Sequence, residues 1–142
     1  MLRAGVAAVA LAAALVGCAA PPRPEPSLYE RVGGRAAIAA VVDDAILNLA
    51  SDARINGRFG NASIPHLQTQ LVDLLCQRTG GPYTYTGANI AAAHEGMHIR
   101  ADEFDALVED IARSLDTFRV PPREKAEVLA ILRQMKPAVI EH

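Results

Sequence analysis

Apolar residues recur at helical spacing along most of the chain. The clearest pattern lies between residues 102 and 119, where apolar side chains fall at offsets of 0, 3, 4, 7, 11 and 14 residues. This spacing places them on one stripe of an α-helix. The residues of the stripe are Phe104, Leu107, Val108, Ile111, Leu115 and Phe118. The pattern predicts one amphipathic helix across this segment.

Four further helices are predicted from shorter apolar patterns and from residues that favour helix starts. The start signals are Gly33-Gly34, Ser63-Ile64-Pro65, Asn89 and Pro121-Pro122. The helix after Asn89 is short, and we expect it to carry Ile90, Ala93, His94 and Met97 on one side. The tract at residues 83–86, YTYT, contains strand-forming residues but is too short to support a sheet. We therefore predict an all-α domain of about five helices, some of them very short.

The N-terminal segment has the composition of a secretion signal. Arg3 precedes an apolar run over about residues 4–16, which is shorter than the roughly 20 residues needed to cross a bilayer. Leu15-Val16-Gly17-Cys18 resembles a bacterial lipobox, in which the cysteine is lipidated and becomes the first mature residue. The pattern predicts a signal peptide over residues 1–17 and lipidation at Cys18, with an uncleaved anchor helix as the alternative.

A proline-rich stretch follows the lipobox. Residues 18–27 have no periodicity, so we expect the lipidated cysteine and an extended tether there, with the folded domain at 28–142. Two acyl chains would hold such a domain stably at a membrane. Ala19 after the cysteine favours sorting to the outer membrane. We expect the protein at the cell envelope, lipid-anchored on the periplasmic face of the outer membrane.

The charge balance argues against nucleic acid as a partner. The chain has 14 Lys and Arg against 16 Asp and Glu, and removal of Arg3 with the signal would leave 13 basic residues. A mildly acidic protein with no basic stripe is not expected to bind nucleic acid. Lipidation of Cys18 would leave Cys76 without a disulfide partner, and its apolar surroundings predict a small core residue.

The segment HEGMH at residues 94–98 has two interpretations. As His-Glu-x-x-His on one helix it matches the zinc-protease signature, with His94 and His98 as ligands and Glu95 as general base. Such a site also needs a third ligand and usually a strand edge for the substrate, and no strand is predicted nearby. Gly96 weakens the helix that would hold both histidines on one side. We therefore reject the zinc-protease interpretation.

In the second interpretation His94 alone faces the interior. It lies four residues after Ile90 and three before Met97, on the apolar side of the predicted helix. A buried neutral imidazole needs a polar partner. A backbone carbonyl is the usual partner, and haem iron is another that an aliphatic all-α domain can accommodate. The residues by themselves leave both partners open.

The order of short motifs resembles the group 1 truncated haemoglobins, small globins with a two-over-two helical sandwich. Residues 28–34, LYERVGG, match the opening LYExxGG of that family, and residues 93–99, AHEGMHI, match the AHxGxxI segment that carries the proximal histidine. Between them, matching motifs stand at Val41-Val42-Asp43-Asp44, Phe59, Gly80-Gly81-Pro82 and Tyr85-Thr86-Gly87. The resemblance covers about residues 28–140. It implies a truncated globin-like fold with haem b as cofactor, and His94 rather than His98 as the iron ligand.

The resemblance also implies which other side chains contact the haem. Phe59 falls at the phenylalanine that stacks on the haem in that family. The expected cofactor-binding residues are His94, Phe59, Leu67, Leu71, Ile90, Ile99 and Tyr85. Tyr85 and Arg100 are candidates for the haem propionates, although ordinary loop and surface roles fit them equally well.

The chain departs from the family pattern on the distal side of the expected haem. Family members usually place a tyrosine in the first long helix, where its hydroxyl donates to bound oxygen, whereas the matching position here is Ile46. Leu67, Gln70 and Leu71 are the pocket positions of the next helix, and Gln70 is the one plausible donor. Without such a donor, O2 should leave faster and the iron should oxidise more easily than in relatives, while CO binding should change little.

These features predict a haem protein that reversibly binds O2, NO or CO, for oxygen transport or nitric oxide detoxification. A haem protein for electron transfer or peroxidase-like chemistry, and a cofactor-free helical lipoprotein, are the alternatives. A catalytic cycle such as nitric oxide dioxygenation would need electrons from a reductase of unknown identity, because no reductase domain is present in the sequence.

Overall fold

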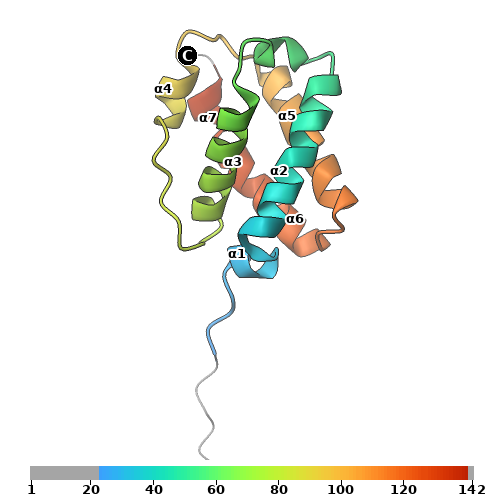
Figure 1. Ribbon diagram of the computed structural model, residues 1–142, viewed down its shortest axis with the longest axis vertical. Helices are drawn as coiled ribbons and strands as arrows, with labels where there is room; N and C mark the ends of the chain where they lie inside the picture. The colour runs from blue at the N-terminus through green and yellow to red at the C-terminus, as the bar shows by residue number, and fades with distance from the viewer. Residues whose placement is uncertain (1–22, 141–142) are drawn as a thin grey trace, which may run out of the picture.

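The computed structural model describes residues 23–140, in which the regular secondary structure is helical (Figure 1). The α-helices are α1 (Leu28–Arg31), α2 (Gly34–Ser51), α3 (Ile64–Arg78), α4 (Ile90–His94), α5 (Ala101–Thr117), α6 (Pro122–Gln134) and α7 (Lys136–Val139), and the 3-10 helix η1 (Asn56–Phe59) joins α2 to α3. Residues 23–140 contain no strand, and one isolated parallel bridge joins Ile99 to Ile140. The predicted all-α fold is confirmed.

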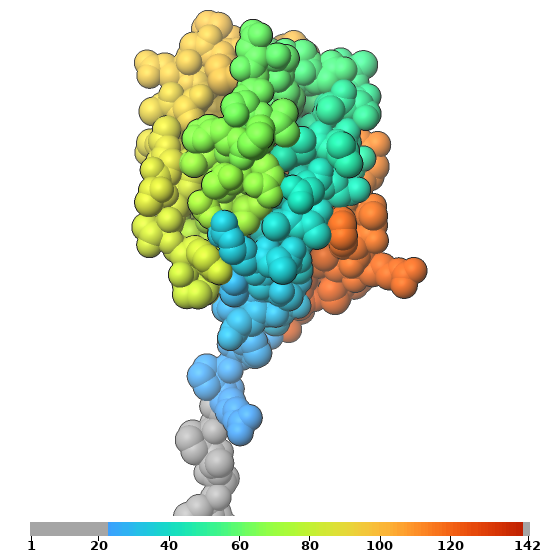
Figure 2. Space-filling view, in the orientation of Figure 1, coloured from blue at the N-terminus to red at the C-terminus, as the bar shows by residue number. Residues whose placement is uncertain are grey.

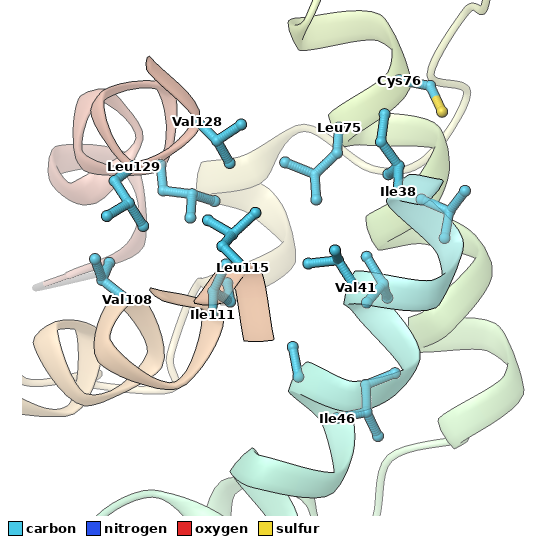
Figure 3. Packing of buried hydrophobic residues seen from close by; sticks show 14 of the residues in the cluster. Ile38, Val41, Ile46, Leu75, Cys76, Val108, Ile111, Leu115, Val128 and Leu129 are labelled. Atoms are coloured by element: carbon cyan, nitrogen blue, oxygen red, sulfur yellow. The ribbon is translucent and has the colours of Figure 1, made fainter. Parts of the chain in front are cut away.

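α2 lies at the centre of the packing. It contacts α3 on one side and α5 on another, and α5 contacts α6. Figure 3 shows their aliphatic side chains pointing toward one another. The cluster includes Ile38 and Val41 of α2, Leu75 of α3, Ile111 and Leu115 of α5, and Val128 of α6. Each buried side chain of this kind contributes about 1.5 to 3 kcal/mol, so this cluster fixes where the four long helices lie.

Glycines allow the tight connections at the start of the domain. Gly33, which caps α2, and Gly34, its first residue, have φ angles of 101° and 74°, a region that favours glycine. Gly81, after α3, is needed for a different reason. A Cβ at this position would lie 2.6 Å from a ring carbon of Tyr29. The absent side chain therefore lets the end of α3 approach α1, where the Tyr29 amide donates to the Thr79 carbonyl over 2.8 Å.

Two predicted helices are shorter than their apolar patterns suggested. The expected stripe of α5 included Phe118, but the helix ends at Thr117 and the Phe118 side chain is 46% exposed. Arg119 follows with φ of 54°, which turns the chain away. The helix after Asn89 was expected to carry Met97, but α4 ends at His94 because the backbone becomes extended at Glu95. In both places the local turn overrode the continuing apolar period.

Cys76 lies in the core, as predicted. Its side chain is completely buried and the thiol is free. Burial in apolar surroundings raises the pKa of the Cys76 thiol, which keeps it protonated near neutral pH.

The predicted signal peptide (1–17) and the lipidation site Cys18 lie outside the described residues. Of the expected tether, residues 23–26 have no regular secondary structure, and Ser27 caps α1 through a reciprocal capping box with Glu30. Glu25 forms a 2.7 Å ion pair with Arg123 of α6. No helix within residues 23–140 is long and apolar enough to span a bilayer.

Candidate functional site

His94 is the last residue of α4, and its half-buried ring is fixed by one backbone contact. Nδ1 lies 2.7 Å from the carbonyl oxygen of Ile90, one turn earlier. A carbonyl oxygen can only accept a hydrogen bond, so Nδ1 carries the proton. In the neutral imidazole the lone pair therefore lies on Nε2. This is the tautomer in which a histidine binds a metal ion while a carbonyl orients its ring.

The short helix that carries His94 depends on its ends and its neighbours. Five residues cannot form a stable helix alone, because the first turn costs more entropy than its hydrogen bonds return. Asn89 caps α4 by accepting from the Ala91 amide over 3.0 Å, as predicted. α4 packs on α7, from the far end of the chain (Figure 1). The position of His94 is thus set by contacts made outside its own helix.

The backbone separates the two histidines of HEGMH. Gly96 and His98 have φ angles of 74° and 49°, so the chain leaves the helix after His94 and turns twice. His98 is exposed and does not share a helical face with His94. Within residues 23–140, no three His, Cys, Asp or Glu side chains are grouped so that they could hold a metal ion. The segment therefore lacks the single helix on which the zinc-protease interpretation depends.

The expected distal residues lie on α2 and α3. Ile46 of α2 is buried in the main core, and Leu71 of α3 is half-buried and packs against that core. Leu67 and Gln70 are also half-buried. In the space-filling view, α3 lies between α2 and the connection that leads to α4 (Figure 2). The residues predicted to contact the distal face are thus aliphatic, apart from Gln70.

Gln70 points toward the loop that precedes α4. A Cβ built at Gly87 would lie 2.0 Å from Oε1 of Gln70 and 2.3 Å from Cζ of Tyr85, so the two side chains meet at this glycine. Oε1 of Gln70 is buried and has no hydrogen-bond partner. The Tyr85 hydroxyl donates to the carbonyl of Ala88 over 3.0 Å, within its own loop. A side chain at Gly87 would have to displace the end of the Gln70 or the Tyr85 side chain.

The other predicted contacts lie at the end of η1, at the start of α4 and just before α5. Phe59 ends η1 and packs, half-buried, with a small cluster of Leu49, Ile55 and Ala106. Ile90 begins α4, and Ile99 is buried beside Ile140. Arg100 is largely exposed and pairs with Asp102 over 3.0 Å. The common role of Phe59 and His94 toward a haem stays a prediction.

The sequence did not predict an ion pair that lies beside the turn after α4. The Arg58 guanidinium, in η1, binds both carboxylate oxygens of Glu103 over 2.9 and 2.8 Å. The Glu103 carboxylate is almost fully buried and also accepts from the Arg100 amide at the start of α5. Arg58 and this amide hold the pKa of Glu103 below its ordinary value of 4.5. A Glu in the first turn of α5 is a capping signal visible in the sequence, but its partner 45 residues away is not.

Comparisons with known proteins decide the family. The model of the bacterial-like globins matches residues 27–141. The chain belongs to the bacterial-like globin family. A group 1 truncated haemoglobin from Tetrahymena thermophila is 32% identical over 114 residues, which cover 80% of this chain and 94% of that one. The identification of group 1 truncated haemoglobins as relatives is therefore confirmed.

Solved structures of globins share the fold. The ferric truncated haemoglobin of Tetrahymena pyriformis superposes with a TM-score of 0.80 at 28% identity, covering 82% of this chain and 100% of that one. The 2/2 haemoglobin of Synechococcus sp. PCC 7002, solved with covalently attached haem, gives a TM-score of 0.77 at 27% identity over 82% of this chain and 100% of that one. The two-over-two helical sandwich is confirmed. Truncated haemoglobins bind haem, so membership of the family supports haem iron as the cofactor of this globin.

Proposed function

We propose that this globin holds haem b through Nε2 of His94 and that it reversibly binds a diatomic gas, O2, NO or CO. The hydrogen bond from Nδ1 to the Ile90 carbonyl carries the proposal, since it leaves Nε2 as the free lone pair. The surrounding side chains suit an apolar macrocycle. Leu67, Leu71 and Ile90 are half-buried aliphatic residues on the helices that would flank it.

Haem, when bound, supplies an iron with one position open to a gas ligand. The residues of the chain would then divide into two groups. His94 would hold the iron, with Ile90 and Ile99 beside it and Phe59 stacked on the ring. Ile46, Leu67 and Leu71 would line the ligand side and exclude water. Tyr85 and Arg100 remain candidates for the propionates, although the Tyr85 hydroxyl already donates to Ala88.

The ligand side of the proposed pocket has little to donate to bound oxygen. Ile46 has no polar group, and the amide of Gln70 lies against Gly87 in the loop before α4. An aliphatic pocket of this kind favours reversible binding with rapid release over tight oxygen retention. Nitric oxide dioxygenation or peroxidase-like chemistry by this globin would require an external electron donor.

We also propose that the globin works at the cell envelope. The lipobox-like residues 15–18 and the proline-rich stretch after them support a lipid anchor on Cys18 and a tether. Membrane fractionation would test this. The native protein should sediment with membranes and resist extraction by salt, whereas Cys18→Ser should not. Sedimentation of both proteins to the same extent would contradict the anchor.

The central experiment is an absorption spectrum of the purified protein, ferric and ferrous with CO, for the wild type, His94→Ala and His98→Ala. We expect a Soret band in the wild type and in His98→Ala, because His98 is exposed and lies beyond α4. His94→Ala should lose most of its haem and keep its helical circular dichroism. Equal haem loss in both variants, or none in either, would contradict His94 as the ligand.

A further inference from the structure

The chain that follows His94 is held by a residue from a distant part of the sequence. Between Glu95 and Arg100 no regular helix or strand forms, apart from the bridge at Ile99. Gly96 and His98 both have left-handed φ angles. The one hydrogen bond that ties this turn to α4 runs from the Met97 amide to the His94 carbonyl over 3.1 Å. The segment therefore depends on other elements for its position.

Arg58 of η1 supplies that support. Its Nη1 donates to the Met97 carbonyl over 2.8 Å, and its Nη2 makes a longer contact of 3.4 Å with the His98 carbonyl. The same guanidinium holds Glu103 of α5 with Nε and Nη2. The planar fork of arginine can bind a carboxylate with two parallel hydrogen bonds and still donate to neighbouring carbonyls, a geometry that the single ammonium of lysine does not reproduce.

The bonds of Arg58 thus join three elements: η1, the turn after α4, and the first turn of α5. These run close together at the upper end of the molecule in Figure 1. Glu103 is itself anchored, because its carboxylate closes the capping box of α5 through the Arg100 amide over 2.8 Å. The guanidinium therefore fixes the turn to a rigid helix, three residues after His94. Asn89 caps α4 at its other end.

We propose that Arg58 is a positioning residue for His94, which restrains the turn at residues 95–100 and so sets the orientation in which the imidazole meets the iron. This inference rests on the proposed haem ligation by His94. The restraint on the turn itself does not need haem, since all of its partners belong to the chain. We call the hydrogen bonds from Arg58 to the Met97 and His98 carbonyls and to Glu103 the clamp. Loss of the clamp would let α4 shift and rotate, and the bond from the imidazole to iron would become more variable.

The test compares four proteins with the wild type. Arg58→Lys keeps the charge and removes the fork. Arg58→Met removes the clamp and leaves the buried Glu103 carboxylate with only Arg100, whose guanidinium lies 3.4 Å away and whose amide donates to it. Arg58→Met with Glu103→Gln removes both charges. Arg54→Ala is the matched control, because this exposed arginine, four residues earlier, pairs with Asp52 and Glu109. Thermal unfolding identifies any variant that has lost the fold as a whole.

Two measurements report on the clamp. Amide hydrogen exchange in the haem-free protein should quicken by about fivefold or more at residues 95–100 in all three Arg58 proteins, and remain unchanged in Arg54→Ala. In the ferrous haem protein, the iron–histidine stretching band in resonance Raman spectra should shift or broaden in the Arg58 proteins alone, and haem transfer to apomyoglobin should accelerate.

The outcomes separate this inference from the proposed function. Unchanged exchange at residues 95–100, or full recovery of wild-type exchange in the double variant, would overturn the clamp, because the double variant still lacks the bonds to the carbonyls. Faster exchange with an unchanged iron–histidine band would overturn the role toward His94. A wild-type protein that binds no haem would contradict the proposed function, and the exchange measurement would still decide the clamp.

Discussion

A single carbonyl group determines what His94 can do. Because Nδ1 donates to the Ile90 carbonyl, the lone pair of the neutral imidazole lies on Nε2. The residue pattern around this histidine left its partner open between a carbonyl and haem iron, and the family resemblance implied iron. The structure shows the Ile90 carbonyl at Nδ1, and we propose iron at Nε2 of the same ring. The backbone also separates His94 from His98. Gly96 and His98 have left-handed φ angles, so His94 and His98 do not lie on one helix.

Gln70 and Ile46 allow a prediction about oxygen release. The Gln70 amide lies at Gly87, so we expect Gln70→Leu to leave the O2 release rate within about twofold of the wild type. Ile46→Tyr would supply a hydroxyl, and we expect release to slow by about tenfold to a hundredfold. Stopped-flow mixing of the oxygenated protein measures both rates.

Carbon monoxide provides the control for these variants, because its binding depends little on a donated hydrogen bond. CO release should stay near the wild-type rate in Gln70→Leu. A large increase in O2 release in Gln70→Leu would identify its amide as a donor that turns toward the ligand. Ile46 is buried, so the thermal stability of Ile46→Tyr should be measured beside its kinetics.

At the scale of helices, the long elements follow the apolar pattern and the short ones follow their contacts. α2, α3, α5 and α6 were each predicted from periodicity and occur near the expected positions. The end of α4 was not predicted correctly, because five residues gain too little from their own hydrogen bonds to extend a helix. Asn89 at one end and the turn held by Arg58 at the other define this helix instead.

The cap of α4 can be tested by exchanging its side chain. Asn89→Ala removes the oxygen that accepts from the Ala91 amide, and we expect it to destabilise the protein by about 1 kcal/mol. Asn89→Ser keeps a capping oxygen and should lose much less. Urea unfolding measures both, and haem loss should follow the same order. Equal stability of the alanine and serine variants would show that the cap contributes nothing to α4.

At the scale of the whole molecule, charge pairs join segments that are remote in sequence. Arg31 binds Glu124 and Glu127 of α6, Arg35 binds Asp73 of α3, and Arg58 binds Glu103 of α5. Most of these groups are partly exposed, where a single pair contributes little. Glu103 differs because its carboxylate is almost fully buried and ionised against Arg58. Its protonation should therefore be felt by the entire fold.

This pair predicts a specific loss of stability in acid. The pKa of Glu103 is lower in the folded protein than its ordinary value of 4.5, so its ionised form stabilises the fold above that pH. The contribution is lost as the pH falls below 4.5 through the folded value. Glu103→Gln should be less stable than the wild type at neutral pH, and its stability should fall less steeply in acid. Urea unfolding across this range measures the slope.

Glu109→Gln is the control for the acid prediction, since Glu109 also pairs with an arginine but its side chain is 62% exposed. Its unfolding should follow the wild-type dependence on pH. Identical acid slopes for Glu103→Gln and the wild type would show that Arg58 and Glu103 contribute no pH-dependent stability.

The sequence by itself determined the helical class, the long helices and the family resemblance, and it predicted Ile46 at the position where the family places a distal tyrosine. These depend on local spacing and residue identity, which periodicity and short motifs record directly. The choice of His94 as iron ligand also came from the sequence, and it stays a prediction that the haem spectra will test.

The tertiary structure alone decided which polar groups meet. The tautomer of His94, the direction of Gln70 and the bonds from Arg58 to Met97 and Glu103 could not be predicted from spacing. Polar partners depend on how distant segments pack. The apolar core of α2, α3, α5 and α6 sets that packing, because its burial contributes more free energy than any single hydrogen bond. A local pattern can therefore name a candidate residue, whereas its partner follows from the fold.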